Sequence, residues 1–333
     1  LIHHNSGFHR IADPFRHPLD VPRTLFSPIG TLADKLRVGR MRQQLTRLSI
    51  AEIMKRGEQT TLTALQERWG FSRKMINRFF RPFFGGIFFD RALDTSSRMF
   101  EFVFKMFAEG QAMLPTGGME EIPKQMRESL PESAVRLNAP VETVEKQTVT
   151  LEHGEMLEAS SVVVAAEAPE ANRLVGGVDT IEGRSTVCFY YAAPHSPVEE
   201  PILVLDGNGT GPINNIAIPS DVAPGYAPDG KALVAAVVVG DPSESDAELE
   251  KEVRGQLIEW FGLVAGGWNH LRTYRIPYAL PNQSPPFLAE PERTVRRRPG
   301  LYVCGDHRRT GSLNGAIASG RAAARAVLED RSS

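Results

Sequence analysis

The chain has 333 residues, of which 41% are apolar and 23% charged, and its formal net charge is −2 at pH 7. This composition is that of a folded globular protein, which argues against disorder, and the near-neutral charge argues against a dedicated nucleic-acid binder. Because single hydrophobic cores stop growing near ~250–300 residues, we expect two domains, or one domain with a large insertion.

Cysteine content and the start of the chain indicate the compartment. Cys188 and Cys304 are too few for a disulfide framework and form no CxxC pair, so we expect a reduced, cytoplasmic setting. No stretch approaches the ~18 consecutive apolar residues that cross a bilayer, and residues 1–6 lack the features of a signal peptide. Because the chain begins with Leu1 rather than Met, we expect that it starts inside a longer gene product.

The first third of the chain is predicted to be helical. Over residues 31–110, apolar residues recur at spacings of three and four, and long β-branched runs are missing. Eleven of the 17 phenylalanines lie between Phe71 and Phe107. Two interpretations stay open for them: a core packed on both sides, or a surface that either lines the route of an apolar substrate or meets a membrane. Phe84 and Phe88 are the candidates for the second interpretation.

The middle of the chain is predicted to alternate strands with helices. One helix is expected over residues 119–130, and another begins at the capping box Ser245-x-x-Glu248. The buried face of the second helix is expected to carry Leu249, Val253, Leu257, Trp260 and Phe261. Strands are expected at residues 135–137, 141–144, 148–151, 161–166, 186–192, 202–205, 213–218 and 232–239. The fully apolar run 161–166 is typical of a buried parallel strand.

The last stretch combines an apolar strand, a polar loop and an Ala-rich helix. The strand 301–304 ends at Gly305-Asp306, and a polar loop and Leu313-Asn-Gly-Ala316 lead to a helix expected over residues 317–328. A carboxylate at the carboxyl end of a parallel strand lies in the crevice where α/β sheets bind ligands. Small residues at a helix start let a ligand approach free N–H groups. The pattern therefore fits a ligand with a diol and a carbonyl or phosphate, although a tight turn before a closely packed helix fits it too.

These residues resemble a known superfamily. Gly305-Asp306, five residues and then Ser312-Leu-Asn-Gly-Ala is similar to the C-terminal FAD motif of the flavin-containing amine oxidases and carotenoid (phytoene) desaturases. Pro115-Thr-Gly-Gly-Met119, with the strands that follow, resembles their middle FAD segment, and Tyr278-Ala-Leu-Pro281 resembles a strand returning towards the flavin. The likeness covers about residues 113–328, and residues 8–40 look closer to desaturase-like members.

The resemblance implies an α/β fold with an FAD-binding, Rossmann-like domain built from discontinuous segments, 113–175 and 286–333. Residues 1–112 and 176–285 would form the helical and antiparallel-sheet parts of a substrate domain. Asp306 would hold the ribityl hydroxyls, the amides of Leu313 to Gly315 would face the flavin pyrimidine oxygen, and Val141 would pair with the adenine. The candidate cofactor-binding residues are Val141, Gly305, Asp306, Ser312, Leu313, Asn314, Gly315 and Ala316. The candidate substrate-channel residues are Phe84, Phe88, Tyr278 and Leu280.

The implied activity is FAD-dependent oxidation, desaturation or isomerisation of a hydrophobic small molecule, without a protein general base, and no catalytic residue is identified. An amine oxidase or a protoporphyrinogen-oxidase-like enzyme is an alternative within the superfamily. From a different class, a non-catalytic scaffold that binds a lipid or a protein partner stays open. A peripheral membrane contact is a further expectation.

One departure from the superfamily concerns the GxGxxG fingerprint that holds the pyrophosphate. The cluster 207–211 is followed by Pro212 and a strand-like run, so it predicts a hairpin turn. We therefore expect that the N-terminal dinucleotide-binding segment is missing and that this chain alone binds FAD weakly.

Other polar residues carry weaker predictions. His3, His4, His9 and His17 lack metal-ligand spacing and predict a solvated segment without a metal site. His307 fits either a flavin site or a surface loop. Arg296 to Arg298, Arg308 and Arg309 predict a solvated, charged loop.

Overall fold

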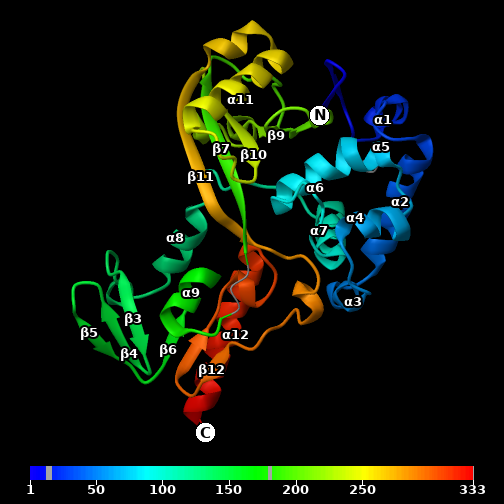
Figure 1. Cartoon of the computed structure of the whole chain (residues 1–333). Helices are drawn as coiled ribbons and strands as arrows, with labels where there is room; N and C mark the ends of the chain where they lie inside the picture. Colours follow the sequence, from blue (N-terminus) through cyan, green and yellow to red (C-terminus); the bar gives the residue numbers. More distant parts are fainter. Residues whose placement is uncertain (13–16, 179–181, 333) are drawn as a thin grey trace. The chain divides into compact units, whose positions relative to one another are not determined.

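The computed structural model describes residues 1–12, 17–178 and 182–332. Residues 13–16, part of the segment that resembles desaturases, lie outside the described residues. The chain forms two compact units, each built from two separate segments (Figure 1). The first contains Leu1–Ile122 and Arg184–Ala279, and the second contains Pro123–Gly183 and Leu280–Ser333. The division into cofactor and substrate domains stays a prediction.

The helical part of the first unit confirms the helices predicted over residues 31–110. Thr31 and Ser49 begin α2 and α3 with complete capping boxes, which satisfy amides that the first helical turn leaves free. Two short helices widen into π-helical turns, η2 (Ala64–Arg68) and η3 (Ile76–Phe80). The helices are α1 (Val21–Phe26), α2 (Leu32–Arg47), α3 (Ile50–Lys55), α4 (Thr61–Thr63), α5 (Arg73–Met75), α6 (Arg81–Phe88) and α7 (Ser97–Glu109).

A seven-stranded, mostly antiparallel sheet completes the first unit. Its order is β11 (Asn269–Pro281), β7 (Gly183–Ala193), β10 (Ala232–Val239), β9 (Ile213–Ala217), β8 (Val204–Asp206), β1 (Ile2–His4) and β2 (Gly7–His9). The strands predicted at 186–192, 202–205, 213–218 and 232–239 are thereby confirmed. Because β8 and β9 pair antiparallel, the cluster 207–211 between them is the turn of a hairpin, as its sequence predicts.

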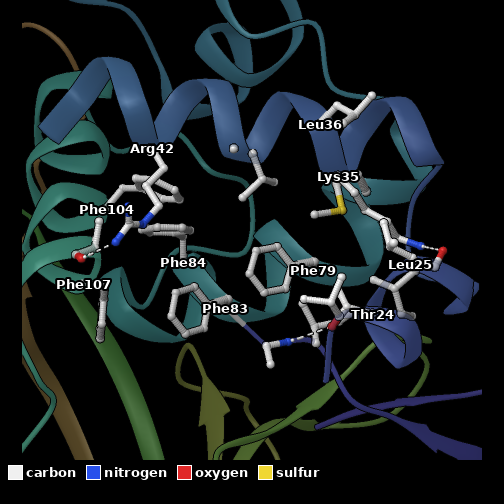
Figure 2. Close-up of a pocket in the computed structure, with 18 residues that line it drawn as sticks. Thr24, Leu25, Lys35, Leu36, Arg42, Phe79, Phe83, Phe84, Phe104 and Phe107 are labelled. Carbon is white, nitrogen blue, oxygen red and sulfur yellow. Dashed lines mark hydrogen bonds between the residues drawn. The ribbon is translucent and has the colours of Figure 1, made fainter. Parts of the chain in front are cut away.

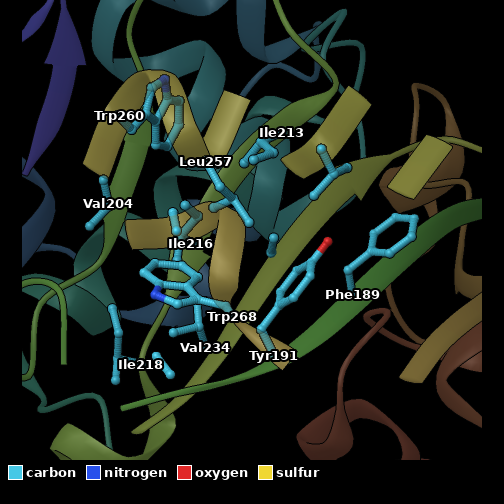
Figure 3. Close-up of a cluster of buried hydrophobic side chains, with 14 of the residues drawn as sticks. Phe189, Tyr191, Val204, Ile213, Ile216, Ile218, Val234, Leu257, Trp260 and Trp268 are labelled. Atoms are coloured by element: carbon cyan, nitrogen blue, oxygen red, sulfur yellow. The ribbon is translucent and has the colours of Figure 1, made fainter. Parts of the chain in front are cut away.

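Two helices pack against this sheet. The helix α11 (Asp246–Phe261) begins at the predicted capping box, and its residues Leu249, Val253, Leu257 and Trp260 are buried in a core with the strands (Figure 3). The helix α6 contacts β8, β9 and β10, and Asn214 Nδ2 donates to Pro82 O at 2.8 Å. Gly86 permits this close approach, because a Cβ there would lie 2.7 Å from Asn215 Oδ1. Most of the predicted core face of α11 is thus confirmed, while Phe261 is half-buried.

The N-terminal hairpin of β1 and β2 corrects one prediction. His3 and His4, expected in a solvated segment, are buried, because β1 pairs parallel with the distant strand β8. The His3 ring stacks on Trp260 with 5.0 Å between centroids, and His4 Nδ1 lies 2.7 Å from Asn208 Oδ1. Burial lowers the pKa of both imidazoles. Among the described residues, no group of three or more His, Cys, Asp or Glu side chains is placed to hold a metal.

The second unit contains two three-stranded sheets. In the first, β3 (Val141–Glu145), β4 (Thr148–Leu151) and β5 (Met156–Glu158) pair antiparallel. In the second, β13 (Leu301–Val303) lies between β12 (Arg296–Arg298) and β6 (Val162–Val164), and β6 and β13 are parallel. The unit also contains α9 (Ala168–Val175) and α12 (Leu313–Ser332), and α8 (Glu121–Glu128) bridges the boundary in sequence.

The strand predicted at residues 135–137 is wrong. Val135 has an extended backbone but ends the short helix η4 (Glu132–Ala134), and within the described chain no strand pairs with it. An extended conformation needs a partner strand before its backbone groups form a ladder. The remaining strands and the helix over 119–130 are found, so the mixed helix-and-sheet fold is confirmed. No helix in the described ranges is long and apolar enough to span a bilayer.

Candidate functional site

The predicted ligand site begins where β13 ends. Cys304 N donates to Val164 O at 2.9 Å, which extends the parallel pairing of β13 and β6 by one residue. Gly305 then turns the chain with φ = 151°, a conformation that favours glycine. A Cβ at this position would lie 2.6 Å from the His307 ring. The turn therefore needs glycine both for its backbone angle and for space.

Ser319 fixes this turn to the helix α12. The Gly305 amide donates to Ser319 Oγ at 2.8 Å, and the same hydroxyl lies 2.8 Å from Gly305 O and 2.9 Å from Ala316 O. Ser319 is fully buried, and its one hydroxyl hydrogen can reach either carbonyl. The strand end and the first turns of α12 are thus held in one arrangement.

The start of α12 offers backbone amides. Ser312 is the N-cap: its Oγ accepts from Gly315 N at 3.0 Å, so this amide already has a partner within the chain. The amides of Leu313 and Asn314 lie at the open end of the helix, where the helical dipole favours negative charge. Gly315 is required here, because a Cβ would lie 1.9 Å from Thr310 O. Of the three amides predicted to face the flavin, two therefore stay open to a ligand.

Asp306 follows Gly305 and begins the short helix η8 (Asp306–Arg308). Burial raises the pKa of its carboxyl group, the charge of Glu167 adds to this, and backbone amides of residues 306 and 307 oppose it. The side chain keeps 26% exposure. A carboxylate in this position can accept hydrogen bonds from the hydroxyls of a polyol, which is the chemistry that a flavin ribityl chain requires. The turn and the helix start therefore fit the predicted cofactor.

His307 lies beneath this turn and is not on the surface. Its side chain is 1% exposed, and among the described residues neither ring nitrogen has a hydrogen-bond partner. Burial, followed by the charges of Arg308 and Arg293, lowers the pKa of the imidazole to about 4. The ring is therefore neutral at pH 7, with one N–H and one lone pair next to Asp306. Of the two interpretations of this histidine, the surface loop is excluded.

This burial predicts a loss of stability in acid. The unfolded chain takes up a proton on His307 near pH 6.5, and the folded chain only near pH 4. The unfolded state therefore binds more protons in this window, and the free energy of unfolding falls as the pH drops from ~6.5 to ~4. The expected loss from this group is on the order of 2–3 kcal/mol.

The measurement is urea unfolding at several pH values, with His307→Gln compared to the parent chain. The variant should lose this part of the acid sensitivity, while the exposed His270→Gln should keep it. Equal pH dependence in the parent and in His307→Gln would contradict the prediction.

The arginines near this turn were predicted to be exposed to solvent, and this holds for some of them only. Arg308, expected in a solvated loop, is 4% exposed and donates to Thr294 O, so that expectation is wrong. Arg309 pairs with Glu292 at 2.7 Å, and Arg296 pairs with Asp330 at 2.7 Å. The sequence does not tell the buried arginine from the exposed ones. Arg308 is buried because residues 293–295, which are distant in sequence, lie beside the turn and bond to its backbone.

Val141, the predicted adenine partner, begins β3 in the same unit. Its carbonyl accepts from Arg173 of α9 at 2.9 Å, and Arg173 also donates to Glu142 O at 2.7 Å. Val141 packs against a core that includes Val303 of β13. The structure thus places Val141 and the Asp306 turn on elements that share one core, and the adenine contact stays a prediction.

A separate, apolar cavity of about 520 Å³ lies within the first unit (Figure 2). It is lined by residues of α1, α2, α5, η3, α6 and α7 together with Ile11, Ala12 and Ile29. Five phenylalanines line it, Phe79, Phe83, Phe84, Phe104 and Phe107. The cationic lining residues bind carbonyl groups: Lys35 Nζ lies 2.7 Å from Leu25 O, and Arg42 donates to Ala108 O at 3.1 Å. The interior that remains is apolar.

The predicted channel residues separate in the structure. Phe84 lines the cavity and is fully buried, whereas Phe88 packs on Phe84 at 5.8 Å between centroids and is not part of the lining. Tyr278 and Leu280 lie half-buried on β11 and do not line this cavity. The contributions of α1 and α2 to the wall were missed, although the four-residue spacing of Val21, Leu25 and Ile29 was a usable signal.

A model of the family described as flavin containing amine oxidoreductase matches residues 3–328. No curated protein matches the sequence.

Three solved structures have a similar fold. An oxidoreductase from Methanosarcina mazei has 18% identity and a TM-score of 0.65, covering 93% of this chain and 75% of that one. A putrescine oxidase double mutant, redesigned in cofactor binding, has 13% identity and a TM-score of 0.67, covering 92% and 77%. Cyclohexylamine oxidase from Brevibacterium oxydans has 14% identity and a TM-score of 0.64, covering 92% and 76%. At these identities the structures show a shared fold.

Proposed function

The chain belongs to the family of flavin-containing amine oxidoreductases, whose cofactor is FAD, and from this we propose that it oxidises a hydrophobic substrate with FAD held at the Asp306 turn. The observation that carries the proposal is the arrangement around Gly305. Asp306 follows a buried parallel strand, and Ser319 holds the backbone of the preceding Gly305 beside the open start of α12. In α/β sheets, nucleotide cofactors bind at this position, beyond the carboxyl ends of the parallel strands.

The residues of this chain would hold the cofactor by complementary polar contacts. Asp306 would accept hydrogen bonds from the ribityl hydroxyls, and its raised pKa reflects burial that such donors would offset. The amides of Leu313 and Asn314 would donate to the pyrimidine oxygen, and the backbone of Val141 would pair with the adenine. When bound, FAD supplies the acceptor for a hydride or its equivalent from a substrate C–H bond.

The cavity in the first unit supports a hydrophobic substrate. Its lining is dominated by phenylalanine, leucine, isoleucine and valine side chains, and its volume of about 520 Å³ accommodates a sizeable organic molecule. The described lining contains Lys35 and Arg42 but no carboxylate. A protonated amine would need an anionic or hydrogen-bond-accepting partner on burial. The cavity therefore favours a neutral or acidic apolar molecule over a polyamine.

Replacing Asp306 with alanine tests the cofactor site. The lost charge-assisted hydrogen bond is worth ~1.5–3 kcal/mol, so the affinity for FAD should fall by roughly tenfold to a hundredfold. Affinity is measured by titrating each purified protein with FAD and following flavin fluorescence, while far-UV circular dichroism checks the fold. Asp306→Asn, which keeps an acceptor oxygen without charge, should lie between the parent and Asp306→Ala.

The matched control is Glu292→Ala, which removes an exposed acid of the same unit that pairs with Arg309. It should leave the affinity for FAD unchanged. Equal affinity in the parent and in Asp306→Ala would show that Asp306 is only a turn residue. Bleaching of the flavin spectrum by an apolar polyene, an amine or a porphyrinogen then identifies the substrate class.

A further inference from the structure

The surface formed by η1 (Pro18–Asp20), α1 and the first half of α2 exposes an unusual number of large apolar side chains. We call it the α1–α2 surface, and its apolar members are Leu19, Leu25, Phe26, Leu32 and Leu36. Leu19 and Phe26 are 93% and 90% exposed. Contiguous apolar surface that stays in contact with water usually marks an interaction site. The exposed apolar side chains of η1, α1 and α2 therefore indicate an interaction surface.

The α1–α2 surface is continuous with the apolar cavity. Leu25 and Leu36 belong both to the exposed group and to the cavity lining, and Val21, also of α1, lines the same cavity. A molecule that covers this surface therefore also meets the rim of the cavity. The α1–α2 surface is exposed, unlike the phenylalanine cluster of α6, whose members Phe84 and Phe88 are buried.

The charge of this segment is strongly positive, although the chain as a whole carries −2. Between Pro18 and Arg47 the cations are Arg23, Lys35, Arg37, Arg40, Arg42 and Arg47, and the acids are Asp20 and Asp34. Asp34 is fully buried and pairs with Arg37 at 3.4 Å, and Asp20 pairs with Arg23 at 3.5 Å, so two acids offset part of this charge and the segment stays net positive. Arg23, Arg40 and Arg47 are exposed.

We propose that the α1–α2 surface docks this protein on an anionic lipid bilayer. Phe26, Leu32 and Leu36 enter the headgroup region, and the exposed arginines contact lipid phosphates, as in amphipathic helices that lie in a membrane interface. A second copy of the chain fits this surface poorly, because two equally cationic faces repel each other. With the rim against the bilayer, an apolar molecule passes into the cavity without crossing water. Docking needs neither FAD nor turnover, so it is independent of the proposed function.

The test is co-sedimentation of the full chain with vesicles of two compositions. One set is phosphatidylcholine alone, and the other is phosphatidylcholine mixed with phosphatidylglycerol. The chain should bind the mixed vesicles more tightly, and binding should weaken as salt screens the arginines. Phe26→Ser combined with Leu36→Ser should reduce binding at least tenfold. Because both side chains are exposed, the melting temperature should stay close to that of the parent.

Two further variants distinguish binding through the α1–α2 surface from nonspecific adsorption of apolar side chains to vesicles. Leu263→Ser removes an apolar side chain that is 87% exposed but lies after α11, and it should leave vesicle binding unchanged. Arg23→Glu with Arg40→Glu should weaken binding to the mixed vesicles roughly twentyfold or more, since each cation near an anionic surface strengthens binding about fivefold.

Three results would overturn the proposal. The first is the absence of binding to either vesicle set, and the second is an equal loss of binding in Leu263→Ser. The third is a concentration-dependent dimer, seen by analytical ultracentrifugation, that the Phe26→Ser and Leu36→Ser changes abolish. That result would assign the surface to a second copy of the chain.

Discussion

Replacing Phe84 with alanine is expected to lower the free energy of unfolding by about 3–5 kcal/mol, the range for buried phenylalanines. Its ring is fully buried and lies 4.7 Å from Phe100 and 5.1 Å from Phe83, centroid to centroid. It also stacks with Phe80 and Phe88. Truncation removes contacts on several sides at once, and surrounding rings cannot all move into the space.

Phe83→Ala is the matched control for this experiment. Phe83 is adjacent in sequence and lines the same cavity, but it is half-buried, so its loss should cost less stability. Urea unfolding followed by tryptophan fluorescence measures both variants. A free energy of unfolding for Phe84→Ala equal to that of the parent, with selective loss of apolar ligand binding, would contradict the core role and favour a purely lining role.

Replacing Glu101 with alanine should cost about 3 kcal/mol of unfolding free energy, the lower end of the ~3–5 range for breaking a buried ion pair. Glu101 lies on α7 and is fully buried. Its carboxylate binds Arg68 at 2.8 Å and Arg56 at 3.0 Å and accepts from the Trp69 indole at 3.2 Å. The guanidinium groups of Arg68 and Arg56 are 21% and 27% exposed. In the alanine variant, water can therefore hydrate them and offset part of the lost ion pairing.

Glu109→Ala controls for the general effect of removing an acid from the same helix. Glu109 pairs with Lys105 but is 43% exposed, and exposed pairs contribute only ~0–1 kcal/mol. Glu101→Gln, which keeps the oxygen for Trp69, should fall between Glu101→Ala and the parent. Equal losses for Glu101→Ala and Glu109→Ala would show that the buried cluster does not stabilise the helical layer.

Local patterns in the sequence predict those elements whose determinants are local. The box Ser245-x-x-Glu248 begins α11 as expected, and the run 232–239 is β10 with the same bounds. The Gly305–Asp306 turn lies where a strand of apolar residues and an Ala-rich helix predict it. Capping, alternation and turn chemistry act within a few residues, so each can be inferred from a short window.

Features that depend on distant partners could not be predicted this way. His3 and His4 have the composition of a solvated segment, and only the pairing of β1 with β8 buries them. Val135 and the residues next to it in sequence have the composition of a strand, but no described strand pairs with them. For Arg308 and His307, burial depends on packing between residues 293–295 and the turn. The roles of Val141 and of Asp306 towards FAD stay predictions for the experiments above.

The discontinuous make-up of both units governs how the chain folds during synthesis. Leu1 N donates to Leu203 O across 202 positions, and the first unit needs residues up to Ala279. The second unit needs the helix α12 near the C-terminus. Contacts between such distant residues slow folding, because a long loop must close before they form. The ribosome must therefore release most of the chain before either core can close. In the interval the strand β1 stays unpaired with β8, which is synthesised about 200 residues later, and in such incomplete states chaperones bind nascent chains and aggregation competes with folding.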